Sequence, residues 1–474
     1  MTSRMTSRLT PFAAALLLLA GCSVTPRYQV PDTALPAGYK EVPAAAEGWL
    51  PAAPADALDR GPWWTLFGDE TLNTLAAQVE VSNQNIAAAV AGYAQSQSLV
   101  KEARASFFPS VSLSGGATRS GGNARTSTGT TYQAALGASW EAPLWGRLEA
   151  GVDTATATAQ ASEADLASAR LSAQAALATN YFSLREADAE IDVVTRTVES
   201  FTRSQTITQN RYDAGVAPKS DLLQAQTQLA NAQADLATLR RQRAVLEHAI
   251  AVLVGKAPAQ FSLPPAAWQM TVPAVPLVVP SELLQRRPDI AGAERSVASA
   301  NAQIGIARSA YFPSLSLSGS YGQQSSAASQ LFNASQNLWS LGLSVAQTIF
   351  DAGATRARVE GAEASRDAAI ARYRQTTLAA LQAVEDQLSL VRMLAEQASL
   401  RAQASKAADD TEVQTLNRYR AGQVSYLEVA SAQSSALSAR RALVQLQVDQ
   451  QLAAIGLIQA MGGGWHSSWT PPRS

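Results

Sequence analysis

The sequence of 474 residues contains one cysteine and two histidines, and its formal net charge is −1. A single cysteine leaves no intrachain disulfide, so packing must stabilise the fold. The balanced charge gives no large electrostatic field of the kind that binds nucleic acid, and we expect no nucleic-acid partner. Beyond the N-terminus there is no run of about 18 uninterrupted apolar residues, which excludes a transmembrane helix. If the chain crosses a membrane, we expect a closed β-barrel.

Residues that carry catalysis are equally scarce. His248 lies near Arg243 and Glu247 in a helical stretch, which favours a packed or solvated side chain over a metal ligand. The other histidine, His466, is close to the C-terminus. The sequence has no metal-binding cluster, nucleophile elbow or phosphate-binding loop. We therefore predict that the protein is not an enzyme and that it has neither a metal nor a cofactor.

The first residues indicate the cellular compartment. Two arginines precede an apolar run at residues 12–20, which is shorter than the about 20 residues that a membrane-spanning helix needs. This pattern is typical of a secretory signal peptide, which we place at residues 1–21. Residues 19–22 resemble a bacterial lipobox, in which the thiol of Cys22 is acylated and becomes the mature N-terminus. The alternative is a signal peptide whose apolar core happens to end near a cysteine.

The segment after the cysteine is predicted to be an anchored strap. Because Ser23 rather than an aspartate follows Cys22, we expect a lipid anchor in the outer membrane and a body that extends into the periplasm. Residues 25–62 are rich in Pro and Ala and poor in periodicity, which predicts an extended tether or strap. We place this lipid-anchored strap at residues 22–68. The apolar residues expected to anchor its end are Trp63, Trp64, Leu66 and Phe67.

An internal repeat organises the rest of the chain. Residues 107–115 recur as residues 311–319, an offset of 311 − 107 = 204. Residues 210–215 recur as residues 417–422, an offset of 417 − 210 = 207. A period this long excludes short solenoid repeats and indicates that one large unit was duplicated.

Each unit is predicted to contain a helix, two strands and a long helical hairpin. The first helix, at residues 72–105 and 281–310, stops at an aromatic-Pro pair, because proline ends a helix at the preceding residue. We therefore divide the chain into a first repeat at residues 69–255, a linker at residues 256–280, a second repeat at residues 281–462 and a tail at residues 463–474.

The residues after each aromatic-Pro pair alternate between apolar and polar, which is the pattern of strands with one apolar face. Ser, Thr, Gly and Gln dominate the other face. The residues expected on the apolar face are Val111, Leu113, Gly115, Ala117, Tyr132, Ala134, Leu136, Ala138 and Trp140, and then Leu315, Leu317, Tyr321, Trp339, Leu341, Leu343 and Val345. The aromatic residues that fit either membrane-interface belts or ordinary sheet packing are Trp140, Trp145, Tyr311 and Trp339.

Very long helices follow the strands. Residues 148–212 and 355–419 contain no proline and little glycine, and good helix formers dominate them. A helix of about 65 residues spans on the order of 100 Å, which suits a coiled coil. Shorter returning helices are expected at residues 220–253 and 425–461. The predicted apolar seam, with a mean spacing of about 3.5 residues, is Ile370, Tyr373, Thr377, Ala380, Val384, Leu388, Val391 and Leu394.

Four strands with one apolar face cannot stand alone in a membrane. Open sheet edges leave backbone groups unsatisfied in lipid, and four strands are too few to close a barrel. Two chains would give eight strands, whose interior is filled by side chains, and three chains would give twelve, which leaves room for a channel. We therefore predict a homotrimer with a polar channel.

The whole mature chain resembles the TolC family of outer-membrane efflux proteins, within the lipoprotein subgroup that is similar to OprM and NodT. The resemblance is carried by the lipobox, the two aromatic-Pro-Ser starts of the strands, the run at residues 284–290, the two Arg-Tyr-x-x-Gly turns and the closing residues 462–465. It implies an α+β membrane protein, a trimeric twelve-stranded outer-membrane β-barrel with four strands per chain, continued by a long periplasmic α-helical coiled-coil tunnel.

The resemblance also implies a function and partners. The chain is expected to be the outer-membrane channel of a tripartite efflux system, passively exporting drugs or other small molecules across the outer membrane. Its expected partners are a periplasmic membrane-fusion adaptor protein, an inner-membrane efflux pump of the RND type and outer-membrane lipid. A function of another class stays open, namely a tether or scaffold lipoprotein that spans the periplasm without transport.

A periplasmic gate is implied at the tips of the helical hairpins. In the family, Asp221 matches a carboxylate that pairs with the gate tyrosine, and Glu428 matches one position of an acidic ring. Ser431 stands where many members carry a second Asp, so we expect a weaker attraction of cations. The predicted gate residues are Tyr212, Asp221, Tyr419, Arg420, Leu427 and Glu428.

Some of these residues also fit a purely structural role. Ser425 and Glu428 have the spacing of a capping box, and Asp221 lies in a first helical turn, where a carboxylate suits the helix dipole. A cap residue can still face a pore, so the two roles are compatible.

The Arg-Arg-Pro-Asp run is the most specific motif of the subgroup. For Arg286, Arg287 and Asp289 we favour a structural role at the start of a helix over a role in transport. Ser281 is the expected N-cap of that helix, with Glu282 in its first turn.

Overall fold

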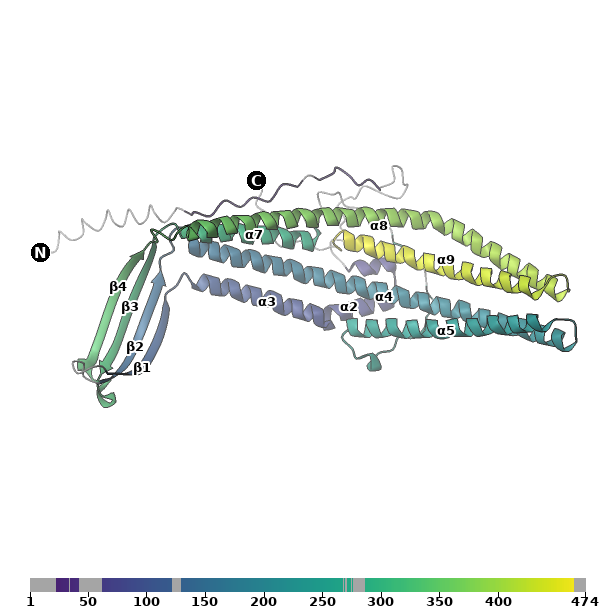
Figure 1. Ribbon diagram of the computed structural model, residues 1–474, viewed down its shortest axis with the longest axis horizontal. Helices are drawn as coiled ribbons and strands as arrows, with labels where there is room; N and C mark the ends of the chain where they lie inside the picture. The colour runs from purple at the N-terminus through teal and green to yellow at the C-terminus, as the bar shows by residue number, and fades with distance from the viewer. Residues whose placement is uncertain are drawn as a thin grey trace.

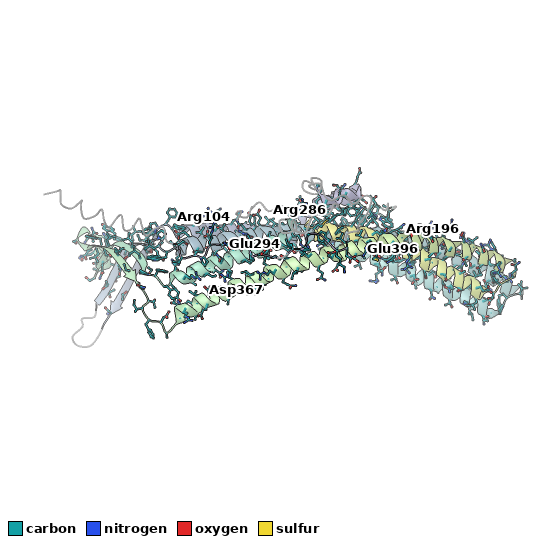
Figure 2. All side chains as sticks on the ribbon, turned by 90° about the horizontal axis from the view of Figure 1, so that it is seen from above. Arg104, Arg196, Arg286, Glu294, Asp367 and Glu396 are labelled. Carbon is teal, nitrogen blue, oxygen red and sulfur yellow. The ribbon has the colours of Figure 1, made fainter. Side chains whose placement is uncertain are left out.

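The computed structural model describes residues 23–33, 35–41, 62–121, 129–266, 268, 271–273, 275 and 286–463. It shows an elongated molecule whose helices run along the long axis and whose sheet projects from one end (Figure 1). Side chains cover the helical body along its length, from Arg104 near the sheet to Arg196 in the distant half (Figure 2). The predictions for the signal peptide, Cys22, Ser281 and His466 lie outside the described residues.

Each half of the chain has helices before its strands and a long helical hairpin after them. The helices are α2 (Glu70–Ser82), α3 (Gln84–Ala105), α4 (Arg147–Asp213), α5 (Lys219–Leu253), α7 (Pro288–Ser309), α8 (Ala354–Arg420) and α9 (Tyr426–Ala460). Short 3-10 turns are η1 (Trp63–Phe67), η2 (Pro258–Gln260), η3 (Ala328–Gln330) and η4 (Ala334–Gln336). The long helices predicted at residues 148–212 and 355–419 are confirmed, with one more residue at each end. Within this described part of the chain, no helix combines the length and apolarity that crossing a bilayer takes.

The prediction of one continuous helix at residues 72–105 is wrong. Asn83 has an extended backbone, with φ −71° and ψ 123°, and separates α2 from α3. Its side-chain oxygen accepts hydrogen bonds from the backbone N–H groups of Asn85 at 3.0 Å and Ile86 at 3.2 Å, which caps α3. In the second half, α7 begins at Pro288, later than the predicted residue 281, and residues 281–285 lie outside the described part of the chain.

The same joint is built in both halves where a returning helix meets the helix before the strands. The Nδ2 of Asn83 donates to the carbonyl of Leu253 at 2.9 Å, and the Nη1 of Arg287 donates to the carbonyl of Ala460 at 2.7 Å. Both carbonyls belong to the last helical turn, where they have no partner within the helix. Arg287 also pairs with Asp289 at 2.6 Å, which agrees with the structural role predicted for this motif.

The four strands form one antiparallel sheet in the order β1-β2-β3-β4. They are β1 (Ser110–Ser120), β2 (Gly129–Glu141), β3 (Ser314–Ser325) and β4 (Asn337–Ala346). The register pairs Leu113 with Leu136, Leu136 with Tyr321, and Tyr321 with Trp339, so these side chains share one face. Leu113 is 81% exposed and Trp339 is 78% exposed in the single chain. The predicted alternation is confirmed, and the apolar face is uncovered.

Serines line the other face of the sheet. The hydroxyls of Ser110 and Ser139 lie 2.8 Å apart, and those of Ser320 and Ser340 lie 2.8 Å apart, across neighbouring strands. At the foot of the sheet the indole of Trp145 stacks on Phe312, with ring centroids 4.8 Å apart. The structure therefore gives Trp145 a packing role at the junction of sheet and helices.

The main core lies at mid-length, where η1 and α2 pack on α4 and α9. Trp63, Trp64 and Phe67 are buried there, which confirms that these residues anchor the segment before α2. Along α8 the predicted seam is also confirmed, because all its residues are buried except Ile370 and Val391, which are half-buried. Packing along seams is therefore what holds the hairpins together.

The N-terminal strap lies along α7 and α8, as its described residues show (Figure 1). The hydroxyl of Tyr28 donates to the carboxylate of Glu294, and the side chain of Asn301 donates to the carbonyl of Pro26 at 2.8 Å. Farther along, the backbone N–H of Lys40 donates to Glu385 at 2.7 Å. The predicted strap along the body is confirmed for residues 23–33 and 35–41.

Candidate functional site at the hairpin tips

The two hairpin tips, which lie at the end of the molecule distant from the sheet, are built in the same way (Figure 1). At the first tip the backbone N–H of Gly215 donates to the carbonyl of Tyr212 at 2.9 Å. At the second tip the N–H of Gly422 donates to the carbonyl of Tyr419, also at 2.9 Å. The repeated Arg-Tyr-x-x-Gly sequence therefore codes one kind of helix stop.

The two tyrosines of this motif have different environments. Tyr419 is 2% exposed, whereas Tyr212 is 37% exposed. The ring of Tyr419 packs edge-on against Tyr426, with centroids 5.6 Å apart, and its hydroxyl lies 3.2 Å from the hydroxyl of Thr208 on α4. Tyr419 of the second tip therefore packs against the first hairpin, whereas the equivalent Tyr212 of the first tip stays exposed.

Arg211 completes the contact between the tips. Its guanidinium lies 4.9 Å from the centroid of the Tyr419 ring, within the range of a cation–π interaction. Its Nη1 also donates to the backbone carbonyl of Tyr419 at 3.2 Å. One arginine of the first hairpin thus holds both the ring and the backbone of one tyrosine of the second.

Asp221 lies beside Tyr426, not in a pair with Tyr419. Among the described residues no hydrogen bond joins Asp221 to either tyrosine, and the buried hydroxyl of Tyr426 has no partner. Burial, together with the nearby Tyr419 and Asp221, raises the pKa of Tyr426 to about 12. The hydroxyl therefore stays protonated at neutral pH, and the carboxylate adds negative potential to the tip.

The capping-box interpretation of the second tip is wrong. Ser425 is the N-cap residue of α9, but its side chain makes no capping hydrogen bond. The backbone N–H of Glu428 donates to the backbone carbonyl of Ser425 at 3.2 Å. The turn is thus closed by the main chain, and the carboxylate of Glu428 is left exposed at the surface.

Three predicted gate residues, Arg420, Leu427 and Glu428, are exposed in the single chain. Leu427 has 61% of its surface exposed. Glu428 and Ser431 line one hollow of about 470 Å³ between α8 and α9. The structure therefore separates the predicted set into buried Tyr419, which joins the hairpins, half-buried Asp221, and residues that are exposed at the first tip (Tyr212) or at the second tip (Arg420, Leu427 and Glu428).

Sequence reasoning missed three residues of this contact, namely Thr208, Arg211 and Tyr426. Arg211 belongs to the repeated motif, so the repeat itself was the available signal. His248 is exposed on α5. Within the described ranges, no group of three or more His, Cys, Asp or Glu side chains is arranged to hold a metal ion.

Comparisons with known proteins place this geometry in context. The family model for outer membrane efflux proteins matches residues 75–256 and 279–463. The chain is 31% identical over 472 residues to the probable efflux pump outer membrane protein TtgC of Pseudomonas putida, covering 98% of this chain and 96% of that protein. It is 29% identical to the cation efflux system protein CusC of Escherichia coli K12, covering 96% and 99%. The solved structure of the outer-membrane channel OprN superposes with a TM-score of 0.81 at 31% identity, covering 94% of this chain and all of that one.

Proposed function

The chain belongs to the outer membrane efflux protein family, and from that premise we propose that it is a lipid-anchored exit duct with a closable periplasmic tip. It is an outer-membrane channel of an efflux system, a kind of protein that transports and does not catalyse. The predicted fold class is confirmed by the solved relatives: a trimeric outer-membrane channel with a β-barrel and a helical tunnel.

The observation that carries the proposal is that one molecule has an uncovered apolar sheet face at one end and a tyrosine contact between its two hairpins at the other end. The sheet edges β1 and β4 are free in one chain, and three copies joined edge to edge give twelve strands. The chain works with other components of an efflux system, and we assign these as a periplasmic membrane-fusion adaptor and an inner-membrane RND pump. The exposed second tip lies at the end of the molecule distant from the sheet, where we expect these components to dock.

The lipid anchor at Cys22 is supported by the position of the next residues. The backbone N–H of Val24 donates to the carbonyl of Trp145 at 3.3 Å, so the strap begins at the junction of sheet and helices. An acyl chain on Cys22 would start at the foot of the sheet, where it can enter the membrane. Within the body we keep the repeats at residues 69–255 and 281–462, which correspond closely to the two segments that the family model matches.

The proposed gate is tested by ion conduction through the purified trimer in a planar bilayer. We expect a low-conductance closed state, which Tyr419→Phe combined with Thr208→Ala converts to frequent opening, because the hydroxyl pair between the hairpins is lost. A trimer that conducts no ions in any variant would instead favour the tether or scaffold function.

The predicted ring of acidic side chains at Glu428 is tested separately by measuring the ion selectivity of the trimer. Glu428→Gln removes three carboxylates from the trimer, so we expect a weaker preference for cations, and added salt should blunt this difference by screening. Ser431 lines the same hollow as Glu428. The opposite substitution, Ser431→Asp, adds carboxylates there and should strengthen the preference for cations. Unchanged reversal potentials in both variants would place these side chains away from the conduction path.

A further inference from the structure

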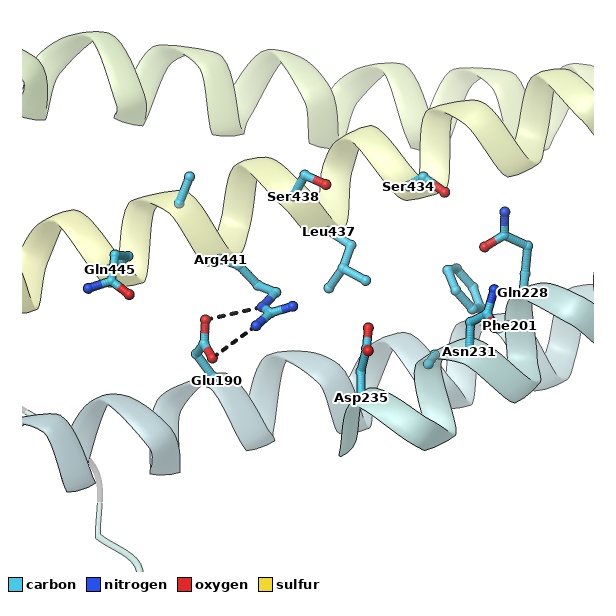
Figure 3. Close-up of a pocket in the computed structure, with 12 residues that line it drawn as sticks. Glu190, Phe201, Gln228, Asn231, Asp235, Ser434, Leu437, Ser438, Arg441 and Gln445 are labelled. Carbon is cyan, nitrogen blue, oxygen red and sulfur yellow. Dashed lines mark hydrogen bonds and ion pairs between the residues drawn. The ribbon is translucent and has the colours of Figure 1, made fainter. Parts of the chain in front are cut away.

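A cleft separates the two hairpins well away from the tips, and one ion pair crosses it. Arg441 of α9 donates to Glu190 of α4 through two contacts, Nε to Oε1 at 3.1 Å and Nη2 to Oε2 at 3.3 Å (Figure 3). The pair stands between two hollows, one of about 500 Å³ toward the tips and one of about 450 Å³ toward the sheet. Both hollows are lined by Glu190 and Arg441.

The interface between the hairpins changes character at this point. On the side nearer the sheet, Val448, Ile455 and Ile458 of α9 are buried in the main core with residues of α4. Toward the tips the contact is smaller and mixed. Leu437 of α9 packs on a small apolar cluster of the first hairpin, Gln433 donates to the hydroxyl of Ser204 at 3.2 Å, and a separate apolar cluster surrounds Tyr419 and Tyr426. The large apolar core therefore fixes α9 at mid-length, and beyond it smaller apolar clusters, polar contacts and hollow space join α9 to the first hairpin. Such an interface permits the second hairpin to pivot.

Arg441 lies less than two helical turns from the buried Val448, on the side toward the tips. Its ion pair with Glu190 is therefore the first polar contact between the hairpins on the tip side of the pivot. The carboxylates in this region outnumber the cations. Glu186 and Glu190 on α4 and Asp235 on α5 act on Arg441, and Asp449 on α9 acts on Glu186, whereas Arg241 of α5 lines the hollow toward the sheet. Only 9% of the surface of Glu190 is exposed to solvent. Without Arg441 the carboxylates of the first hairpin would lose their cation from α9, and Glu186 and Asp449 would repel each other across the cleft.

We propose that Glu190 and Arg441 form an inter-hairpin latch, a pair of positioning residues that holds the second hairpin against the first independently of the tips. The inference rests on the proposed function, because it assumes that opening of the duct moves one hairpin relative to the other. Opening then requires release at two levels, the tyrosine contact at the tips and the latch near the pivot.

The test measures the distance between the tips directly. Spin labels at Val216→Cys and Gln423→Cys are placed in the full-length protein, and the trimers contain an excess of unlabelled subunits, so that only pairs within one chain contribute. We expect Arg441→Gln to shift the distance distribution toward longer values, with about five-fold more of the long-distance population. This factor corresponds to the loss of about 1 kcal/mol, a value suited to a partly exposed pair.

The neighbouring arginine provides the matched control. Arg440 lies next to Arg441 but donates to Glu412 at 2.7 Å, which is a contact within the second hairpin. Arg440→Gln should leave the distance distribution unchanged. The double variant Glu190→Arg with Arg441→Glu should restore the wild-type distribution, which a merely structural role for either residue would not do.

Three results would overturn the latch: a wild-type distribution in Arg441→Gln, an equal shift in Arg440→Gln, or no recovery in the double variant. Conductance of the same variants separates the latch from the proposed function. If the tip distance shifts and the trimer still conducts no ions, the latch stands and the duct function fails. If the duct conducts and the distance never shifts, the latch alone fails.

Discussion

At the scale of single residues, the contact between the tips depends on an arginine that faces a tyrosine from another hairpin. Arg211 and Arg418 occupy the same position in the repeated motif, 207 residues apart. Only Arg211 has an aromatic ring and a backbone carbonyl within reach, both of Tyr419. The sequence could identify the motif but not this asymmetry, because it arises from the way one hairpin packs on the other.

We predict that Arg211→Met opens the tips and that Arg418→Met does not. The substitution removes a cation–π contact and a charge-assisted hydrogen bond, each worth on the order of 1 kcal/mol or more. Leak of a large hydrophilic antibiotic into cells should therefore rise about five-fold or more for Arg211→Met. Equal leak in both variants, at equal amounts of trimer, would show that the contact does not close the duct.

The cleft between the hairpins also contains a carboxyl group that titrates near neutral pH. Burial, with Glu190 and Asp449 nearby, raises the pKa of Glu186 from 4.5 to about 7, and Arg441 opposes the shift. The charged groups around Glu186 are Glu190 on α4, Arg441 and Asp449 on α9, and Arg241 of α5, which lines the same hollow. The closed cleft binds the proton of Glu186 more tightly than a hydrated, open cleft would.

We therefore predict that the duct opens more often as pH rises. The stabilisation from a protonated Glu186 is complete below about pH 4.5 and is lost as the pH passes through about 7. Open probability in a planar bilayer should increase across that window. Glu186→Gln keeps the neutral form at every pH, so its profile should be flatter, and an unchanged profile would assign the titration to another group.

At the scale of whole elements, the sequence predicts helix ends well where the signal is local. The long helices stop at residues followed by Gly215 and Gly422, and each prediction was correct to one residue. The break at Asn83 was missed because no proline or glycine marks it, although Val81, Ser82 and Asn85 around it are weak helix formers. Its cause is partly distant in sequence, since the Asn83 side chain also bonds the end of α5 at Leu253.

We predict that Asn83→Ala lowers the stability of the first half more than a surface substitution does. The change removes two capping hydrogen bonds and leaves the carbonyl of Leu253 without its partner, which together cost about 2 to 3 kcal/mol. The thermal midpoint of the trimer should fall, and Asn85→Ala, two residues away and exposed, is the control. An equal midpoint in the two variants would mean that the joint contributes little.

At the scale of the whole molecule, the single chain is incomplete. The strand pattern predicted the apolar face, and the register Leu113–Leu136–Tyr321–Trp339 confirms it, but none of the residues that the structure describes covers that face. The number of chains followed from barrel closure rather than from any one residue. The gate could be predicted only in part, because Arg420, Leu427 and Glu428 are exposed in the single chain and their role in the trimer stays a prediction.

The two faces of β4 offer a matched test of how the trimer sits in the membrane. Leu341 lies on the apolar face, opposite Gly319, and its neighbour Ser340 lies on the polar face, opposite Ser320. An arginine on a lipid-facing strand position costs about 2 to 4 kcal/mol near the bilayer centre, and the trimer repeats that cost in each subunit. We therefore predict that Leu341→Arg strongly reduces the amount of trimer in outer-membrane fractions.

Ser340→Arg should assemble normally, because its side chain extends into water in the channel. Three added cations there should shift the reversal potential toward anions, which a planar bilayer measures. The pair of variants therefore separates failed assembly from altered conduction. If Leu341→Arg assembles as well as Ser340→Arg, the apolar face does not contact lipid, and the assignment of the inner and outer faces of the barrel is reversed.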